Sequence, residues 1–308
     1  MNLMIVTNSL YLKPAYVMLY SLFENHRNIP MDIYLPYEGL SREELSGLAR
    51  FCEKFQEKRL HPLYVGTAFK EQVQSKSGIN VDTYYRILGI NLLPKELDRI
   101  LYLDVDMVIQ GSLLELYETD LRGKAFAVCE DIFGKINSFH KENMQRLGIP
   151  ENYTYFNAGV MLFHLDYLRA VSGAERMMDS IYQNYERYYY NDQDVMNELF
   201  YDQLEIAGWD LYNCPPAWYY LDKAKLAAGR LEFLDYHTME TDAKDTKVFE
   251  EKYQNMTRQI YQNARIIHYL AATKPWLSTR KQTTVYDLFD GAYWKYANEL
   301  EQMEPALF

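Results

Sequence analysis

The first third of the chain alternates short apolar segments with segments whose apolar residues recur at helical spacing. The short segments predict buried strands, and the others predict helices that cover them. We expect strands at residues 3–6, 31–35, around 63 and 99–103, and helices at 14–23, 42–55 and 82–93. Ser41 and Glu44 form a capping box ahead of the second helix. This alternation predicts an α/β fold with a parallel sheet, in which ligands bind beyond the carboxyl ends of the strands.

The second half of the chain is less regular. Strands are expected at residues 125–129, 156–165 and 265–270, and helices at 174–187, 194–201 and 286–300. A length of 308 residues suits one large α/β domain with an appended tail. We expect the domain to cover residues 1–276 and the helical C-terminal tail to cover 277–308.

Charge and cysteine content narrow the class of partner and the compartment. A net charge of -11 argues against a nucleic-acid partner but allows a nucleotide. The three widely spaced cysteines and the absence of a signal peptide predict free thiols and a cytoplasmic protein. There is no apolar run of 18 residues, so we expect no transmembrane segment. The acidic C-terminus predicts weak membrane association at most, and nothing in the sequence sets the oligomeric state.

Asp104 and Asp106 follow the apolar segment 100–103 directly. If they continue that strand, their side chains share one face, about 7 Å apart along the chain. Two carboxylates this close are unfavourable unless a cation neutralises them, so the pair predicts a divalent metal site. The pair is also compatible with a solvated strand end carrying two incidental acids. A third interpretation is a phosphohydrolase of haloacid-dehalogenase type, with Asp104 as nucleophile and Asp106 as acid/base.

His268 lies in the expected strand 265–270, and Lys274 follows it on a loop. The histidine is either a core residue or a metal ligand. The lysine supplies a point charge suited to phosphate. Two carboxylates with an imidazole suit Mn²⁺ better than Ca²⁺.

Two further segments carry polar residues in apolar surroundings. Asn191-Asp-Gln-Asp194 precedes a helix, where acids favour the helix dipole. Its side chains either cap that helix or face a sugar. Phe156-Asn-Ala-Gly159 lies in an apolar run, where the amide needs partners and the glycine allows close approach by another chain segment or a ligand.

Taken in order, these motifs resemble glycosyltransferase family 8, the retaining enzymes of the glycogenin and lipopolysaccharide galactosyltransferase type. The resemblance covers about residues 1–276. The matching blocks are Ile5-Val-Thr-Asn-Ser-Leu-Tyr11, Thr83-Tyr-Tyr-Arg86, Leu101-Tyr-Leu-Asp-Val-Asp106, Phe156-Asn-Ala-Gly159, Asn191-Asp-Gln-Asp194 and His268-Tyr with Lys274-Pro-Trp276. The resemblance implies a GT-A fold, a Rossmann-like mixed, mostly parallel sheet flanked by helices.

The resemblance also implies an activity: transfer of glucose or galactose from a UDP-hexose donor to a saccharide or lipid-linked glycan acceptor, with retention. The implied cofactor is Mn²⁺, with Mg²⁺ as the second candidate, held by Asp104, Asp106 and His268. The implied uridine pocket is Thr7, Asn8 and Tyr11, with Tyr11 stacked on uracil, and Lys274 contacts the diphosphate. The implied donor-sugar contacts are Arg86, Asp131, Asn157, Ala158, Asp192 and Gln193, with Asp194 as a nearby carboxylate.

The sequence departs from the family at two places near these residues. Asn8 stands where the family often has an acid, and the loop 270–273 lacks the usual glycine. The catalytic candidates are Gln193, Asp192 and Asp194. Gln193 is a poor nucleophile, and the neighbouring Asp194 should diverge from it by about 100° on a helix. We therefore expect a front-face mechanism in place of a double displacement.

Overall fold

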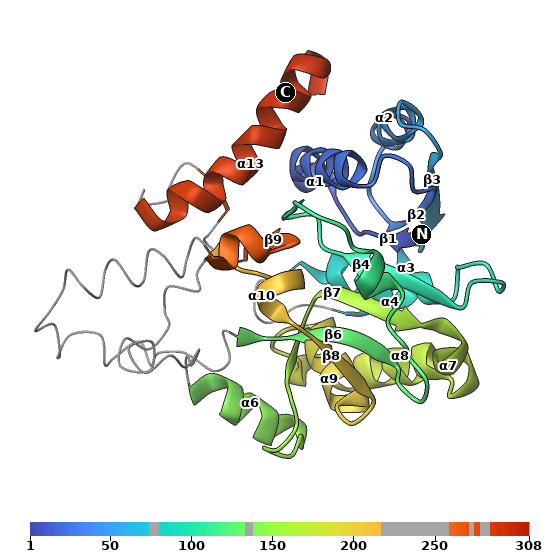
Figure 1. Ribbon diagram of the computed structural model, residues 1–308. Helices are drawn as coiled ribbons and strands as arrows, with labels where there is room; N and C mark the ends of the chain where they lie inside the picture. The colour runs from blue at the N-terminus through green and yellow to red at the C-terminus, as the bar shows by residue number, and fades with distance from the viewer. Residues whose placement is uncertain (74–79, 133–137, 217–258, 271–273, 278–283, 308) are drawn as a thin grey trace, which may run out of the picture.

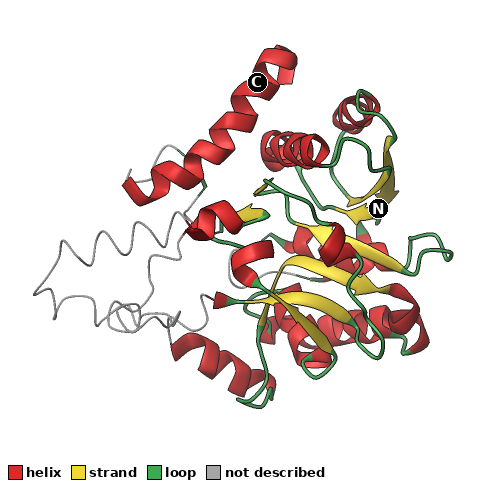
Figure 2. Ribbon diagram, viewed as in Figure 1, coloured by secondary structure: helices red, strands yellow, loops and turns green. Residues whose placement is uncertain are grey.

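The computed structural model describes residues 1–73, 80–132, 138–216, 259–270, 274–277 and 284–307 (Figures 1 and 2). They form a seven-stranded sheet with the order β3-β2-β1-β4-β7-β6-β8 and a small sheet of β5 and β9. The strands are β1 Asn2–Met4, β2 Met31–Tyr37, β3 Lys58–Tyr64, β4 Arg99–Leu103, β5 Met107–Ile109, β6 Phe126–Glu130, β7 Phe156–His164, β8 Leu204–Ala207 and β9 Ile266–His268. β7 pairs antiparallel with β4 and β6, and the other pairs of the large sheet are parallel. The expected mixed, mostly parallel sheet is confirmed.

Helices cover both faces of this sheet (Figure 2). The helices are α1 Leu12–Asn25, α2 Arg42–Glu53, α3 Ala68–Gln72, α4 Tyr85–Ile90, α5 Leu114–Tyr117, α6 Ser138–Leu147, α7 Leu165–Ala170, α8 Gly173–Asn184, α9 Asp192–Phe200, α10 Trp209–Tyr212 and α13 Thr284–Met303. Short 3₁₀ turns lie at Ser9–Tyr11, Val81–Tyr84, Tyr185–Arg187 and Pro305–Leu307.

The alternation of side chains along β4 separates two cores. Leu101 and Leu103 join the core formed with α1, α2 and α13, whereas Ile100 and Tyr102 join the core formed with α4, α8 and α9. Every residue from Ile100 to Leu103 is buried, because helices lie on both faces of the strand. This is why the segment is apolar without alternation.

Local signals in the sequence matched the elements well, with differences at their ends. The capping box is formed: Ser41 N donates to Glu44 at 2.7 Å, and Glu44 N donates to Ser41 Oγ at 3.2 Å. The expected helix 82–93 is instead a 3₁₀ turn followed by the short helix α4, which ends at Ile90. Residues 91–93 continue as turns, and Pro94 prevents the helix from resuming, since proline disfavours a helical conformation for the residue before it.

The expected strand 99–103 is β4, and the two aspartates follow it directly, as expected. Asp104 and Asp106 lie in the connection between β4 and β5, outside both strands. The reason is that β5 leaves the large sheet and pairs antiparallel with β9, which places Met107 opposite His268. Because Asp104 and Asp106 immediately precede β5, this pairing places both carboxylates close to His268.

The C-terminal helix α13 packs on α1 and contributes Phe289, Tyr293 and Leu300 to the core on that face. It is longer at both ends than the expected helix 286–300. Among the described residues, no helix is long and apolar enough to cross a membrane.

Candidate active site

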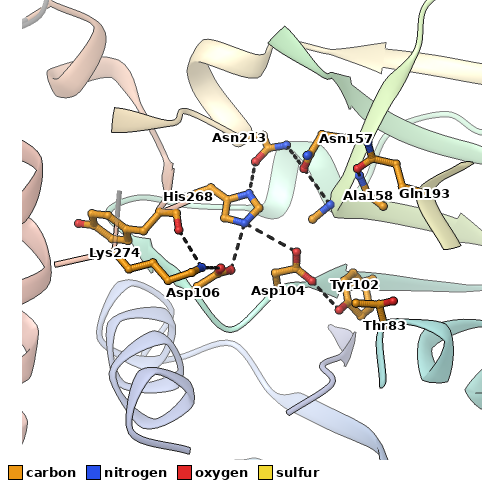
Figure 3. A network of polar contacts seen from close by, with 12 residues as sticks. Thr83, Tyr102, Asp104, Asp106, Asn157, Ala158, Gln193, Asn213, His268 and Lys274 are labelled. Atoms are coloured by element: carbon orange, nitrogen blue, oxygen red, sulfur yellow. Dashed lines mark hydrogen bonds and ion pairs between the residues drawn. The ribbon is translucent and has the colours of Figure 1, made fainter. Parts of the chain in front are cut away.

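Three potential metal ligands converge beyond the carboxyl end of β4 (Figure 3). One ligand atom each from Asp104, Asp106 and His268 lies within 4.8 Å of the others. His268 Nε2 is 3.1 Å from an Asp106 oxygen and 3.7 Å from an Asp104 oxygen. The imidazole is buried, while the carboxylates are 27% and 14% exposed. The cluster is therefore fixed at the histidine and open at the aspartates.

The absence of a side chain at Gly159 on β7 leaves room for the ring of His268. A Cβ at Gly159 would lie 2.3 Å from His268 Cε1, far inside contact distance. The carbonyl of Gly159 also accepts a hydrogen bond of 2.9 Å from Asp104 N. The close approach that this glycine allows is made by the histidine of another chain segment.

The ammonium group of Lys274 lies beside the carboxylate of Asp106. Lys274 Nζ pairs with Asp106 and donates to Tyr269 O at 3.0 Å. Burial alone would raise the pKa of Asp106, but the charges of His268 and Lys274 hold that pKa well below its usual value. Two carboxylates and an imidazole, in a place that attracts positive charge, fit a divalent ion such as Mn²⁺.

Arg86 on α4 links the metal-ligand cluster to β7 and α9. It is 4% exposed, and its guanidinium lies 4.1 Å from the centre of the Tyr102 ring. It contacts Asp104 at 3.3 Å and Asp192 at 2.8 Å, and it donates to Ala158 O.

Tyr102 also contacts the carboxylate of Asp104. Its hydroxyl donates to Asp104 Oδ1 at 2.6 Å. Burial raises the pKa of Tyr102 well above its usual value, so the hydroxyl keeps its proton and remains a donor.

The residues expected to contact the donor sugar form one hydrogen-bonded group. Gln193 Oε1 accepts from Ala158 N at 3.0 Å, and Gln193 Nε2 donates to Asp131 at 3.0 Å. Asn157 Nδ2 donates to the same Asp131 oxygen at 3.3 Å. Gln193 is thus held by both ends of its amide, and its orientation is fixed.

Asp194 has different partners from Gln193. It has no exposed surface and accepts five hydrogen bonds, from Asn143, Arg146, the Tyr155 hydroxyl, and the backbone N–H groups of Tyr189 and Tyr190. These donors come from α6, from the residue that precedes β7 and from the loop before α9. Asn191 in that loop has a positive φ of 47°, an unfavourable backbone conformation for a residue other than glycine. Asp194 therefore holds the start of α9 in place.

The expected uridine residues lie at the end of β1 and the start of α1. Asn8 uses its side-chain oxygen to cap the 3₁₀ turn, accepting from Leu10 N and Tyr11 N, and its amide donates to Asp82 at 3.1 Å. Thr7 is buried, and its hydroxyl donates to Asn8 O at 3.4 Å. Tyr11 adjoins the metal-ligand cluster, since Lys274 Nζ is 5.4 Å from its ring centre.

The site contains partners that the sequence did not reveal, notably Tyr102, Tyr155 and Asn213. Tyr102 stands two residues before Asp104, a spacing that a strand pattern could have indicated. Asn213 contacts His268 across a sequence separation of 55 residues, and no motif marks it.

Residues 2–280 match the family described as Glycosyl transferase family 8. The lipopolysaccharide 1,2-glucosyltransferase of Escherichia coli K12 is 27% identical over 267 residues, which cover 86% of this chain and 70% of the relative. General stress protein A of Bacillus subtilis is 25% identical over 222 residues, covering 71% and 67% of the two chains.

The fold is shared with a crystal structure of the galactosyltransferase LgtC in complex with donor and acceptor sugar analogs. The TM-score is 0.72 at 19% identity, and all of both chains is covered. Since the family match spans most of the sequence and the fold agrees, the chain belongs to glycosyl transferase family 8.

Proposed function

We propose that this protein is a retaining hexosyltransferase that moves glucose or galactose from a UDP-hexose to a hydroxyl of a saccharide or glycoconjugate acceptor. One observation carries the proposal: Arg86 contacts Asp104 of the metal-ligand cluster and donates to Ala158 O, while the amide of Gln193 accepts from Ala158 N and donates to Asp131. A diphosphate at the cluster would place its hexose near that amide. The name of the Escherichia coli relative, a glucosyltransferase acting on lipopolysaccharide, supports a glycan or lipid-linked glycan acceptor.

We propose that Asp104, Asp106 and His268 hold Mn²⁺, with Mg²⁺ as the second candidate. When bound, the ion supplies positive charge to the leaving diphosphate. Lys274 adds a second positive charge at the same place, because its ammonium already lies beside Asp106. Burial disfavours the charged lysine, yet the neighbouring carboxylate raises the pKa of Lys274, so the side chain stays protonated.

The arrangement of Gln193 and Asp194 supports a front-face reaction. The acceptor oxygen forms a bond to the anomeric carbon on the side from which the diphosphate leaves, and the acceptor proton passes to a diphosphate oxygen. Gln193 is an amide held in one orientation, which suits it to position the sugar. Asp194 would have to give up five hydrogen bonds to act as a nucleophile.

We also propose that the protein works in the cytoplasm. Cys52, Cys129 and Cys214 are all buried free thiols, and burial raises the pKa of each thiol, so all three stay protonated and unreactive. We keep the division into a catalytic domain at residues 1–276 and a tail at 277–308 as part of this proposal.

A donor screen tests the proposed function. We expect release of UDP from UDP-glucose or UDP-galactose with Mn²⁺, and no release from GDP- or ADP-sugars. Excess chelator should abolish the reaction, and Asp106→Ala should reduce the rate by about 10²-fold or more. Asp98→Ala is the matched control, since Asp98 precedes β4 at the opposite end of the strand and its side chain is 60% exposed. Full activity of Asp106→Ala in chelator would rule out the proposed metal site.

The same preparations test the phosphohydrolase interpretation. That interpretation requires Asp104 to attack a phosphomonoester, whereas here the Asp104 carboxylate accepts hydrogen bonds from Tyr102 and Arg86. We expect no cleavage of p-nitrophenyl phosphate. Robust cleavage that disappears in Asp104→Asn would favour the hydrolase.

A further inference from the structure

Asn213 lies on the opposite side of the His268 ring from the two carboxylates (Figure 3). Its side-chain oxygen is 2.7 Å from His268 Nδ1, and its amide nitrogen is 3.0 Å from Asn157 Oδ1. Both asparagines are buried. The contact is between side chains of three separate segments: the end of α10, β7 and β9.

The backbone fixes Asn213 opposite His268. Cys214 forms a bridge to Ile267, so the segment after α10 runs beside β9. Cys214 N donates to Ile266 O at 3.1 Å, and His268 N donates to Cys214 O at 2.9 Å. These two bonds set the register in which the side chains of Asn213 and His268 face one another.

The direction of each hydrogen bond in this group follows from one backbone donor. Gly159 N–H can only donate, and it lies 3.0 Å from Asn157, so the Asn157 atom that receives it is the oxygen. The Asn213 atom that contacts the same oxygen must then be its NH₂ group. The remaining Asn213 atom, facing His268, is the carbonyl oxygen, which can only accept.

The consequence falls on the histidine. A ring nitrogen that faces an acceptor must carry a hydrogen, so His268 holds its proton on Nδ1. Whenever the ring is neutral, its lone pair is then on Nε2, which lies 3.1 Å from an Asp106 oxygen and 3.7 Å from an Asp104 oxygen. Without a metal, a proton on Nε2 can be donated to Asp106; with the Nδ1 proton kept by Asn213, a divalent cation can take the place of the Nε2 proton and bind the lone pair together with the two carboxylates.

We infer that Asn213 is a positioning residue that fixes the Nδ1–H tautomer of His268 and thereby directs Nε2 at the metal. The inference on the metal rests on the proposed function, whereas the tautomer does not. Since Asn157 also bonds Asp131, and Asp131 bonds Gln193, the same chain of bonds connects the metal-binding histidine to the amide beside the donor sugar. Asn213 makes the hydrogen bonds that link His268 to Asn157 within this chain.

Titration with Mn²⁺ alone, without donor, measures the effect on the metal. We expect Asn213→Leu to bind Mn²⁺ about 10- to 100-fold more weakly, the range found when a residue that orients a metal ligand is lost. Asn213→Asp keeps an acceptor for Nδ1–H and should retain affinity closer to the wild type. Asn143→Leu is the matched control, because Asn143 is an equally buried asparagine that bonds Asp194 and not His268. It should leave Mn²⁺ affinity unchanged.

Nitrogen NMR of protein labelled at its histidines tests the tautomer directly, at a pH where the ring is neutral. The chain has six histidines, and the signals of His268 are identified by their absence in His268→Gln. We expect the Nδ1–H form in the wild type and a mixture of tautomers in Asn213→Leu. An Nε2–H form in the wild type would overturn the inference, even if Asn213→Leu does not fold.

The His268→Gln variant separates the two proposals. If His268→Gln loses Mn²⁺ affinity and Asn213→Leu does not, the positioning role is wrong and the metal site stands. If His268→Gln binds Mn²⁺ like the wild type, the proposed metal site is wrong, and the tautomer seen by NMR decides the role of Asn213 alone.

Discussion

The ring of His268 occupies the space that a side chain at Gly159 would need, since a Cβ there would lie 2.3 Å from Cε1 of the imidazole. Gly159 has no positive φ, so alanine fits its backbone and only the clash opposes it. We predict that Gly159→Ala displaces His268 and weakens Mn²⁺ binding by at least about 10-fold. The strain should also lower the free energy of unfolding by about 1–3 kcal/mol. Metal titration and chemical denaturation measure the two effects.

Gly291 on α13 provides the control for this substitution. A Cβ at Gly291 would meet no atom within 4 Å. Gly291→Ala should leave Mn²⁺ affinity unchanged and stabilise the helix by about 0.5–1 kcal/mol. If Gly159→Ala binds Mn²⁺ as well as Gly291→Ala does, the packing of the histidine on β7 does not matter for the metal.

Gln193 and Asp194 should differ in what their loss affects. Gln193→Ala removes the amide that we propose positions the donor sugar, so we predict a loss of about 10- to 100-fold in transfer rate with measurable activity remaining. Asp194→Asn leaves buried donors, including Arg146, without their charged acceptor. We predict a loss of about 3–5 kcal/mol in unfolding free energy.

Two measurements on the wild type distinguish positioning by Gln193 from covalent catalysis by Asp194. Proton NMR of the product should show the anomeric configuration of the donor retained. Intact mass after incubation of the wild type with donor should show no added hexose. A stable hexose adduct on Asp194 would contradict the front-face reaction, and an inverted product would contradict retention.

Sequence patterns predicted those parts of the fold that depend on neighbours in the chain. The apolar run of β4 and the capping box at Ser41 are local, and both are present. The strand β5 was missed because three residues are too few to show a pattern, and its partner β9 lies far along the chain. Without β5, nothing in the sequence showed that the two aspartates lie in a short connection between two strands.

The resemblance to known enzymes implied the three residues of the expected metal site, Asp104, Asp106 and His268, but not what holds them in place. Asn213 comes from a loop that the pattern of apolar residues leaves unassigned. Its role depends on the register between Cys214 and Ile267, a contact that exists only in the folded chain. The sequence indicated that Gly159 allows close approach by another chain segment or a ligand. Only the structure shows that the approaching group is the ring of His268.

Lys274 acts as an internal cation on Asp106, so it should have opposite effects on metal and donor. We predict that Lys274→Gln binds free Mn²⁺ about threefold or more tightly, because Asp106 no longer has a competing positive charge. The same variant should bind UDP-hexose about 10-fold more weakly, since the diphosphate loses a cationic partner. Calorimetric titrations with each ligand measure both. Lys54→Gln, which breaks a surface pair with Glu304, should change neither.

The buried carboxylate of Asp192 changes its charge close to neutral pH. It is 3% exposed and lies 2.8 Å from the guanidinium of Arg86. Burial raises the pKa of Asp192 to about 6, and the attraction of Arg86 offsets only part of that effect. An unfolded aspartate has a pKa of about 4, so between these two pKa values the native state binds the proton more tightly. Protonation of Asp192 therefore stabilises the fold as the pH falls through this window.

Donor binding should change in the opposite direction to stability over the same pH range. Above pH 6 the Asp192 carboxylate accepts hydrogen bonds and balances Arg86, whereas below it the neutral acid leaves Arg86 to attract Asp104 alone. We predict that UDP-hexose affinity falls by up to about 10-fold for each pH unit below that pKa. Titration calorimetry of the wild type and Asp192→Asn from pH 5 to 8, with saturating Mn²⁺, measures this. The variant carries no titrating group at this position. Its affinity for UDP-hexose should therefore be lower than that of the wild type at pH 8, and should change less between pH 8 and pH 5. Parallel pH profiles in the two proteins would show that another group controls the loss.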